Sequence, residues 1–271
     1  MNRLLLITLI FSFLTLMTSK AQEGNWDVYM AQYEKGAGSI ALNMDLIGIA
    51  PNKTLPFILI TGVKFDNCRE DGFPNSDEFE KLYNVSDNIE NLIKENVAYE
   101  LAGTFTYQCE RLDYIYLSDT ISIRKKLIEL YTSKFGNYEY FINLKPDNSW
   151  KAYKEFLYPN EITQEYMSNQ KVLFQLQKAG DNLSKQRQVD HWIYFSQESN
   201  KEEFKKYVES LGFKVEGQQN DKNFELPYQL HISRIDYIYP ESINKITLEL
   251  RKKAKDLNGD YDGWETFVIT E

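Results

Sequence analysis

The chain contains two histidines, His191 and His231, and these are the first candidates for chemistry because paired histidines often begin a zinc site. Both fall in alternating segments that predict neighbouring β-strands. Structural zinc takes four protein ligands and catalytic zinc usually takes three, whereas Asp190 is the only further donor close by in the sequence. We therefore predict ordinary strand histidines and no metal site.

Asn258, Asp260, Asp262 and Gly263 have the spacing that opens an EF-hand calcium loop. The twelfth position of that loop is Ile269, where a bidentate glutamate is needed, and a strand-like segment follows in place of a second helix. A turn rich in Asp, Asn and Gly explains the same residues. We expect no calcium and no other cofactor.

Catalytic motifs are equally sparse. Residues 36–41 fit a loose dinucleotide-binding pattern, but they lie between two predicted strands and no helix follows. The sequence has no Gly-x-Ser-x-Gly elbow, no phosphate loop and no cysteine with a local base. We predict no catalytic residues, and the alternative is an enzyme whose carboxylates meet only in the fold.

Aromatic side chains give the clearest candidate surface. Trp192 and Tyr194 alternate on one predicted strand, and Tyr237 and Tyr239 alternate on its neighbour. If His191 and the other intervening side chains face the helices, these rings share the open face of the sheet. The face either packs against other parts of the chain or binds a partner.

A duplicated segment organises these elements. Arg111-Leu112-Asp113-Tyr114-Ile115-Tyr116 recurs as Arg234-Ile235-Asp236-Tyr237-Ile238-Tyr239, and the match continues without a gap to Tyr138 and Tyr261. Strand and helix patterns around both copies give the order βαββαβ. We therefore predict an α+β protein with two ferredoxin-like antiparallel sandwiches in tandem, the first extended by a hairpin at residues 26–49.

Cys68 and Cys109 are the two cysteines of the chain. In the predicted first sandwich, Cys68 follows the first strand and Cys109 precedes the third, and those strands are adjacent and antiparallel. We therefore predict a disulfide between them.

The first residues resemble a secretory signal peptide: Arg3, an apolar run from Leu4 to Met17, then Ser19-Lys20-Ala21. The run is shorter than the roughly 20 residues of a membrane span. We predict cleavage after Ala21, no remaining membrane anchor and an exported, periplasmic or secreted protein. Its net charge would be about −11, which disfavours nucleic acid as a partner.

Two regions resemble known families. Val172-Leu173-Phe174-Gln175-Leu176, Asp190-His191-Trp192 and Tyr261-Asp262-Gly263-Trp264-Glu265-Thr266 are similar to the regulator of ribonuclease E activity B (ribonuclease E inhibitor) family. Residues 26–158 resemble a family of domains of unknown function that is sometimes joined to it. The first resemblance implies inhibition by binding, without chemistry, although export would separate this chain from a cytoplasmic ribonuclease.

These observations predict three segments: a signal peptide at 1–21, an N-terminal α+β domain at 22–158, and a domain at 159–271 resembling the ribonuclease inhibitor family. The predicted function is non-catalytic binding of a protein partner. The predicted contact residues are Trp192, Tyr194, Tyr237, Tyr239, Tyr261, Asp262 and Trp264. A periplasmic enzyme and a purely structural two-domain protein are the alternatives.

Overall fold

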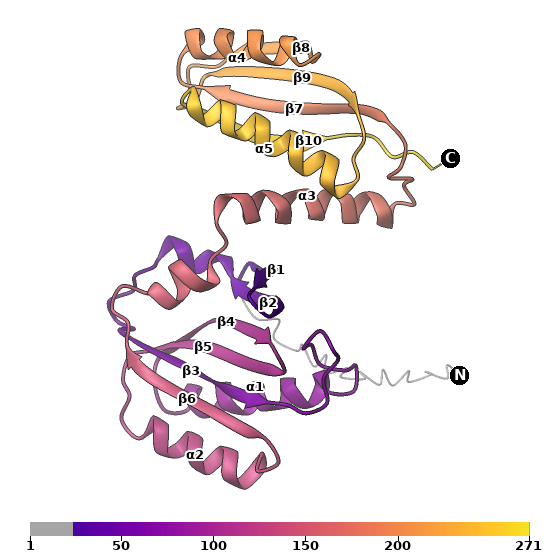
Figure 1. The fold of residues 1–271 in the computed structure, drawn as a ribbon. Helices are drawn as coiled ribbons and strands as arrows, with labels where there is room; N and C mark the ends of the chain where they lie inside the picture. The colour runs from indigo at the N-terminus through magenta and orange to yellow at the C-terminus, as the bar shows by residue number, and fades with distance from the viewer. Residues whose placement is uncertain (1–23, 271) are drawn as a thin grey trace, which may run out of the picture. The chain divides into compact units, whose positions relative to one another are not determined.

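A computed structural model of the chain describes residues 24–270, so the predicted signal peptide lies outside the described residues. Internal contacts divide the chain into two compact units after Tyr158. We call residues 24–158 unit 1 and residues 159–270 unit 2, and Figure 1 shows the elements of each. Both units are mixed α+β structures with one antiparallel sheet each.

Unit 1 consists of a β-hairpin followed by four strands and two helices. Its elements are β1 (Trp26–Tyr33), β2 (Gly36–Asn43), the 3-10 turn η1 (Met44–Gly48), β3 (Phe57–Lys64), α1 (Phe79–Lys94), β4 (Tyr99–Tyr107), β5 (Glu110–Leu117), α2 (Ile123–Lys134), β6 (Glu139–Pro146) and the short π-helical segment η2 (Ala152–Leu157). The sheet has the strand order β1-β2-β4-β5-β3-β6, and all neighbouring strands are antiparallel.

The sheet of unit 1 carries a core on each face. Strand side chains alternate between faces, so Leu59 and Ile115 pack under α1 and α2, whereas Ile58 and Tyr116 pack against Trp150 and the hairpin. Figure 1 shows α1 and α2 on the same side of β3 to β6. The strands β3 and β5 are therefore covered on both faces, whereas the edge strand β6 is largely exposed.

The predicted disulfide is confirmed. Cys68 and Cys109 are bonded, with their Cα atoms 5.7 Å apart. Strand order brings the two cysteines together. β3 pairs with β5, and Lys64 at the end of β3 lies opposite Glu110 at the start of β5. Cys109 forms part of the tight β4–β5 turn, and the bond ties this turn to the loop after β3.

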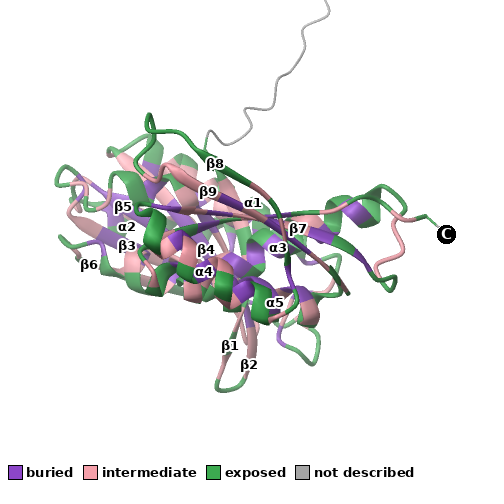
Figure 2. Cartoon of the chain, turned by 90° about the horizontal axis from the view of Figure 1, so that it is seen from above, coloured by how far each residue is buried: buried purple, intermediate pink, exposed green. Residues whose placement is uncertain are grey.

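Unit 2 begins with a long helix and continues with four strands and two helices. Its elements are α3 (Glu161–Lys178), β7 (Arg187–Phe195), α4 (Glu198–Ser210), β8 (Lys214–Asn220), β9 (Tyr228–Asp236), α5 (Pro240–Asp256) and β10 (Gly259–Glu265). The strand order is β10-β7-β9-β8, with antiparallel pairing throughout. The edge strand β8 is largely exposed (Figure 2).

Period-two alternation on β7 is confirmed. His191, Ile193 and Phe195 are fully buried on the side of α4 and α5, while Trp192 and Tyr194 between them are half-buried on the other side. The helix α3 packs beside α5 and closes a second small core with Leu173, Leu176 and Trp264. Thus the helices of unit 2 leave the Trp192 side of its sheet uncovered.

Several predicted boundaries are wrong. The strand on which Tyr237 and Tyr239 were predicted ends at Asp236, because its pairing with β7 ends at Arg187 and Pro240 then starts α5. The hairpin predicted at residues 26–49 ends at Asn43, whose side chain accepts a hydrogen bond from the Asp45 amide and starts a 3-10 turn. Within residues 24–270, no helix is long and apolar enough to cross a membrane.

Candidate functional site

The open face of the unit 2 sheet is centred on a stacked pair. Trp192 on β7 lies opposite His231 on β9, and the two rings stack with centroids 4.6 Å apart and an angle of 10°. His231 Nε2 lies 2.8 Å from Asp190 Oδ1, and Gln188 Nε2 donates to the same carboxylate. The indole is therefore held in one orientation, half-exposed, by a polar network on the same face.

Tyr194 extends this aromatic surface toward β10. Its hydroxyl accepts a hydrogen bond from Gln229 Nε2 at 2.8 Å. The register of β10 against β7 shifts between Tyr261 and Gly263, which is a β-bulge. A shallow hollow of about 430 Å³ lies there, lined by Trp192, Tyr194, Gln229, Asp262, Gly263, Trp264 and Glu265.

Tyr261 and Trp264 flank the bulge and are both buried. Only 1% of Tyr261 and 8% of Trp264 is exposed. Tyr261 Oη lies 2.8 Å from His191 Nδ1, and burial raises the pKa of the phenol well above its ordinary value. Trp264 Nε1 donates to Asn169 Oδ1 at 2.7 Å. Of the predicted contact residues in this segment, Tyr261 and Trp264 expose little surface and Asp262 is exposed.

Tyr237 and Tyr239 form a separate pair. They follow the end of β9 and lie on either side of Ile238, which is fully buried. The two rings are 5.6 Å apart, and 41% of Tyr237 and 43% of Tyr239 is exposed. Tyr237 is six residues beyond His231, which corresponds to about 20 Å along an extended chain. The four predicted aromatics therefore form two patches rather than one cluster.

The matching residues of unit 1 are covered. Tyr114 and Tyr116 of the repeated hexapeptide lie on the side of the sheet opposite α1 and α2, and both are buried. Tyr116 stacks on Trp150 with centroids 3.8 Å apart, and Tyr114 stacks on Phe156 at 5.5 Å. Residues 150–158 thus cover in unit 1 the positions that are exposed in unit 2.

The two histidines lie in adjacent cross-strand pairs but on opposite faces. His191 lies opposite Ile232 and is fully buried, whereas His231 lies opposite Trp192 on the open face. Burial is the main reason that the pKa of His191 is lowered to about 3. In the part of the chain described here, no cluster of His, Cys, Asp and Glu has the arrangement of a metal site.

The residues with EF-hand spacing also lie apart from any ligand loop. Gly259 to Glu265 form β10, and Asp260 lies opposite Tyr194 in the β7 ladder. Asn258 precedes the strand with a φ of 51°, as expected for a turn residue. The Asp and Asn side chains belong to a helix-to-strand turn and to the strand itself.

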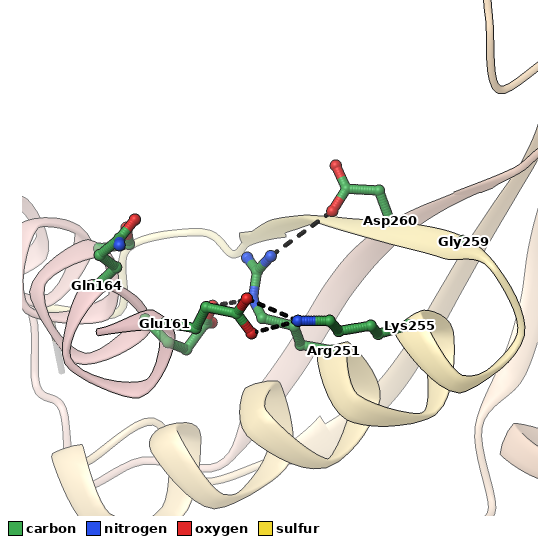
Figure 3. A pocket seen from close by; sticks show the side chains of 8 residues that line it. Glu161, Gln164, Arg251, Lys255, Gly259 and Asp260 are labelled. Carbon is green, nitrogen blue, oxygen red and sulfur yellow. Dashed lines mark hydrogen bonds and ion pairs between the residues drawn. The ribbon is translucent and has the colours of Figure 1, made fainter. Parts of the chain in front are cut away.

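A charged hollow lies between α3, α5 and β10 (Figure 3). Arg251 Nε lies 2.5 Å from Glu165 Oε2, and its Nη1 lies 3.7 Å from Asp260 Oδ1. Lys255 Nζ contacts both oxygens of Glu161 at 2.6 Å, and this contact lowers the pKa of Glu161. Each of these charges has an opposite partner, so the cluster fastens α3 to α5 and β10.

Two carboxylates of unit 1 have raised pKa values, Glu100 on β4 and Asp113 on β5, and burial is the first cause in both. Glu100 lies opposite Tyr116, whose ring is on the face away from the helices, whereas Asp113 lies opposite Thr104 and bonds to its hydroxyl at 3.0 Å. Both acids contribute to the walls of one pocket in unit 1.

Comparison with protein families separates the two halves of the chain. Residues 167–266 match the family described as Regulator of ribonuclease activity B. The two units match different families. Residues 24–158 match a family of unknown function, DUF695. Both predicted resemblances are confirmed, and the comparison with curated proteins found no match.

The sequence predicted that Trp192 and Tyr194 share one face of the sheet, because alternation on a strand is a local signal. It missed His231 and Asn169 as supports, since their partners are distant in the sequence. Asn169 Nδ2 donates to Asn244 Oδ1 and lies 2.8 Å from Thr247 Oγ1, while its oxygen accepts from Trp264. No pattern in α3 distinguishes Asn169 from a solvent-exposed amide.

Proposed function

We propose that this chain is an exported, non-catalytic regulatory protein that binds a protein partner through the open face of unit 2. The family description, a regulator of ribonuclease activity, supports a regulatory role that needs no chemistry. The Cys68–Cys109 disulfide supports an oxidising compartment outside the cytoplasm. Export makes a cytoplasmic ribonuclease an unsuitable target, so the binding mode is what the family match contributes.

One observation carries the proposal: the aromatic residues of the repeated hexapeptide are buried in unit 1, whereas their counterparts in unit 2 follow the end of β9 and remain exposed. Tyr116 is fully buried beneath Trp150, while its counterpart Tyr239 is 43% exposed. Tyrosine and tryptophan are the residues that most often anchor protein interfaces. We therefore assign Tyr237, Tyr239, Trp192, Tyr194 and Asp262 to the contact surface.

The same repeat supports a shared architecture. We infer that both units are ferredoxin-like sandwiches derived by duplication, with β1 and β2 added to the first. The orders β4-β5-β3-β6 and β10-β7-β9-β8 become the same order when each βαββαβ segment is numbered from its own first strand. Arg111 and Arg234 then lie on the third strand of their segments, opposite Val63 and Val189 respectively.

The test is site-directed photocrosslinking in native cells with the full-length chain. A photoreactive phenylalanine analogue replaces Tyr237 in one variant and Tyr166 in the other. Tyr166 is a matched control, because it lies on α3 of the same unit and is 43% exposed, close to the 41% of Tyr237. The proposal predicts one discrete protein adduct from position 237 and none of that mass from position 166. Equal labelling from both positions would contradict it.

The alternatives make different predictions. A purely structural role predicts that the Tyr237 probe crosslinks only within the chain. An enzyme predicts turnover that depends on convergent acids, and the candidates in unit 1 are Glu100 and Asp113, whose pKa values are raised by burial and which line one pocket.

A further inference from the structure

Unit 1 contains a long groove on the helix side of its sheet. The hairpin β1–β2 widens the sheet beyond the reach of two helices: α1 contacts α2 and β4, and α2 contacts β6. The helix side of β1, β2 and β4 is therefore left open beside α1. The space has a volume of about 1240 Å³, and residues 26–43, 69–74, 79–94 and 99–115 contribute to its walls. This exceeds the roughly 300–1,000 Å³ of sites for small molecules.

The walls of the groove expose apolar side chains. Val28 on β1 is 58% exposed and Met30 is 56% exposed, and both line the space. Phe79 and Tyr83 on α1 form the opposite wall, with their rings 6.3 Å apart. Val28 and Met30 are two residues apart on a strand, so their side chains are separated by roughly 7 Å. That spacing is the side-chain repeat of an extended peptide.

The floor of the groove is polar. Arg111 lies with its guanidinium carbon 5.0 Å from the centre of the Tyr83 ring, and Asp113 is buried beside Thr104. Arg111 Nε and Trp26 Nε1 are buried N–H groups without a hydrogen-bond partner in the described chain. A buried donor without an acceptor is unfavourable, and an acceptor from a ligand would remove that penalty. The floor is therefore suited to a ligand that brings hydrogen-bond acceptors such as carbonyl oxygens.

The charge of the groove selects against an acidic ligand. Its lining includes three cations, Arg69, Lys94 and Arg111, and five carboxylates, Asp71, Asp87, Glu90, Glu100 and Asp113. Arg69 is already occupied by Asp71, with Nη2 and Oδ2 2.9 Å apart. Without this pair, four carboxylates and two cations remain in the lining, so a ligand with net positive charge is favoured.

We propose that this groove binds an extended peptide segment with apolar side chains at alternate positions and a net positive charge. The apolar side chains of the peptide lie between the β1 side chains, Val28 and Met30, and the aromatic rings of α1. The peptide carbonyl groups face the donors of the floor, and basic side chains approach the carboxylates. The disulfide holds one end of the groove in place, because the loop after Cys68 contributes Arg69, Asp71 and Phe73 to its lining.

In the experiment, the full-length chain is titrated into a labelled, end-blocked peptide of about seven residues, and the fluorescence anisotropy of the label is measured. The peptide has Val, Leu and Phe at alternate positions, with Lys and Ser between them. Three further probes are compared: the same peptide with Glu for Lys, the same composition with its apolar residues consecutive, and labelled octanoate. The proposal predicts saturable binding of the first peptide, weakened about tenfold or more by the change of Lys to Glu.

Variants of β1 decide where the peptide binds. Val28→Asp combined with Met30→Asp places charge on the apolar wall and is expected to weaken binding about tenfold or more. Gln32→Asp is the matched control, because Gln32 is exposed on the same strand but does not line the groove. It should leave affinity within about twofold. Circular dichroism and retention of the Cys68–Cys109 bond verify that each variant folds.

Three results would overturn the proposal. These are absence of saturable binding by the first peptide, equal affinity of the wild type and the folded Val28→Asp/Met30→Asp variant, and binding of octanoate in preference to the peptide. The last result would assign the groove to a small carboxylic acid. None of these outcomes bears on the Tyr237 surface of unit 2, since the groove and that surface are tested with different probes and variants.

Discussion

Tyr116 and Tyr239 occupy matching positions of the repeated hexapeptide and differ in what covers them. The Tyr116 ring stacks on Trp150 in the core of unit 1, with centroids 3.8 Å apart, whereas 43% of Tyr239 is exposed. Tyr116 Oη also donates to Asp147 Oδ2 at 2.7 Å. The same sequence thus serves as core in one unit and as surface in the other, which is why we assign binding to the second.

Removal of the disulfide is predicted to lower the free energy of unfolding. Cys68→Ser combined with Cys109→Ser opens a loop with a sequence separation of 41. On the chain-entropy model, the free energy of unfolding falls by roughly 4 kcal/mol. Denaturant unfolding with and without reductant measures it, and reductant should leave the double variant unchanged. Two free thiols titrated in the denatured, non-reduced wild type would contradict the bond.

Breaking the ion pair between Arg187 and Asp181 is predicted to lower the stability of unit 2 strongly. Both side chains are fully buried, with Nη1 and Oδ2 2.5 Å apart, and Arg187 also donates to the carbonyl groups of Asn182 and Phe267. Arg187→Ala leaves a buried carboxylate without its cation and should lower the free energy of unfolding by about 3–5 kcal/mol.

Arg69→Ala is the control for that substitution, because the Arg69–Asp71 pair is half-exposed and its loss should have a much smaller effect. Asp181→Ala added to Arg187→Ala should recover part of the lost stability, since it removes the stranded charge. Equal denaturant midpoints for wild type and Arg187→Ala would show that the pair contributes nothing.

The lowered pKa of His191 predicts that the stability of the protein depends on pH. Burial lowers its pKa to about 3, compared with about 6.5 in the unfolded chain. Between these values the unfolded state binds more protons, so stability is lost as the pH falls from about 6.5 towards 3, by up to about 1.4 kcal/mol per pH unit. His191→Gln should show a shallower decline over that range. Parallel pH profiles for the two proteins would mean that His191 does not titrate on unfolding.

The first residues of the sequence predict where the exported protein begins. If residues 1–21 are a signal peptide, the exported protein begins at Gln22 and carries no lipid. Intact-mass measurement with N-terminal sequencing of the exported form checks both points. A protein that retains Met1 and stays in the membrane fraction would contradict export.

The sequence predicts local features of this structure well. The burial of His191, Ile193 and Phe195 on one side of β7 follows from strand alternation, which needs no tertiary information. The Cys68–Cys109 bond follows from strand order, because pairing of β3 with β5 brings both cysteines to one end.

Long-range features are not readable in the same way. The end of β9 depends on where β7 stops, so Tyr237 and Tyr239 fall outside the ladder in which alternation placed them. The groove of unit 1 joins Trp26, Tyr83 and Arg111, which only the folded chain brings together. Burial of Tyr261 and Trp264 depends on His191 and Asn169 as hydrogen-bond partners, and neither pairing has a signature in sequence.

The most direct test of the binding role is the affinity of the partner recovered by crosslinking at position 237. Tyr237→Ser combined with Tyr239→Ser removes two exposed rings, and Tyr166→Ser removes one of the same exposure elsewhere in unit 2. Exposed substitutions of this kind change stability by about 0.5 kcal/mol or less. We predict that the purified partner binds the double variant at least about thirtyfold more weakly than wild type, while Tyr166→Ser binds as wild type does. Equal affinities for the folded double variant and the wild type would contradict the assignment of this face as the binding surface.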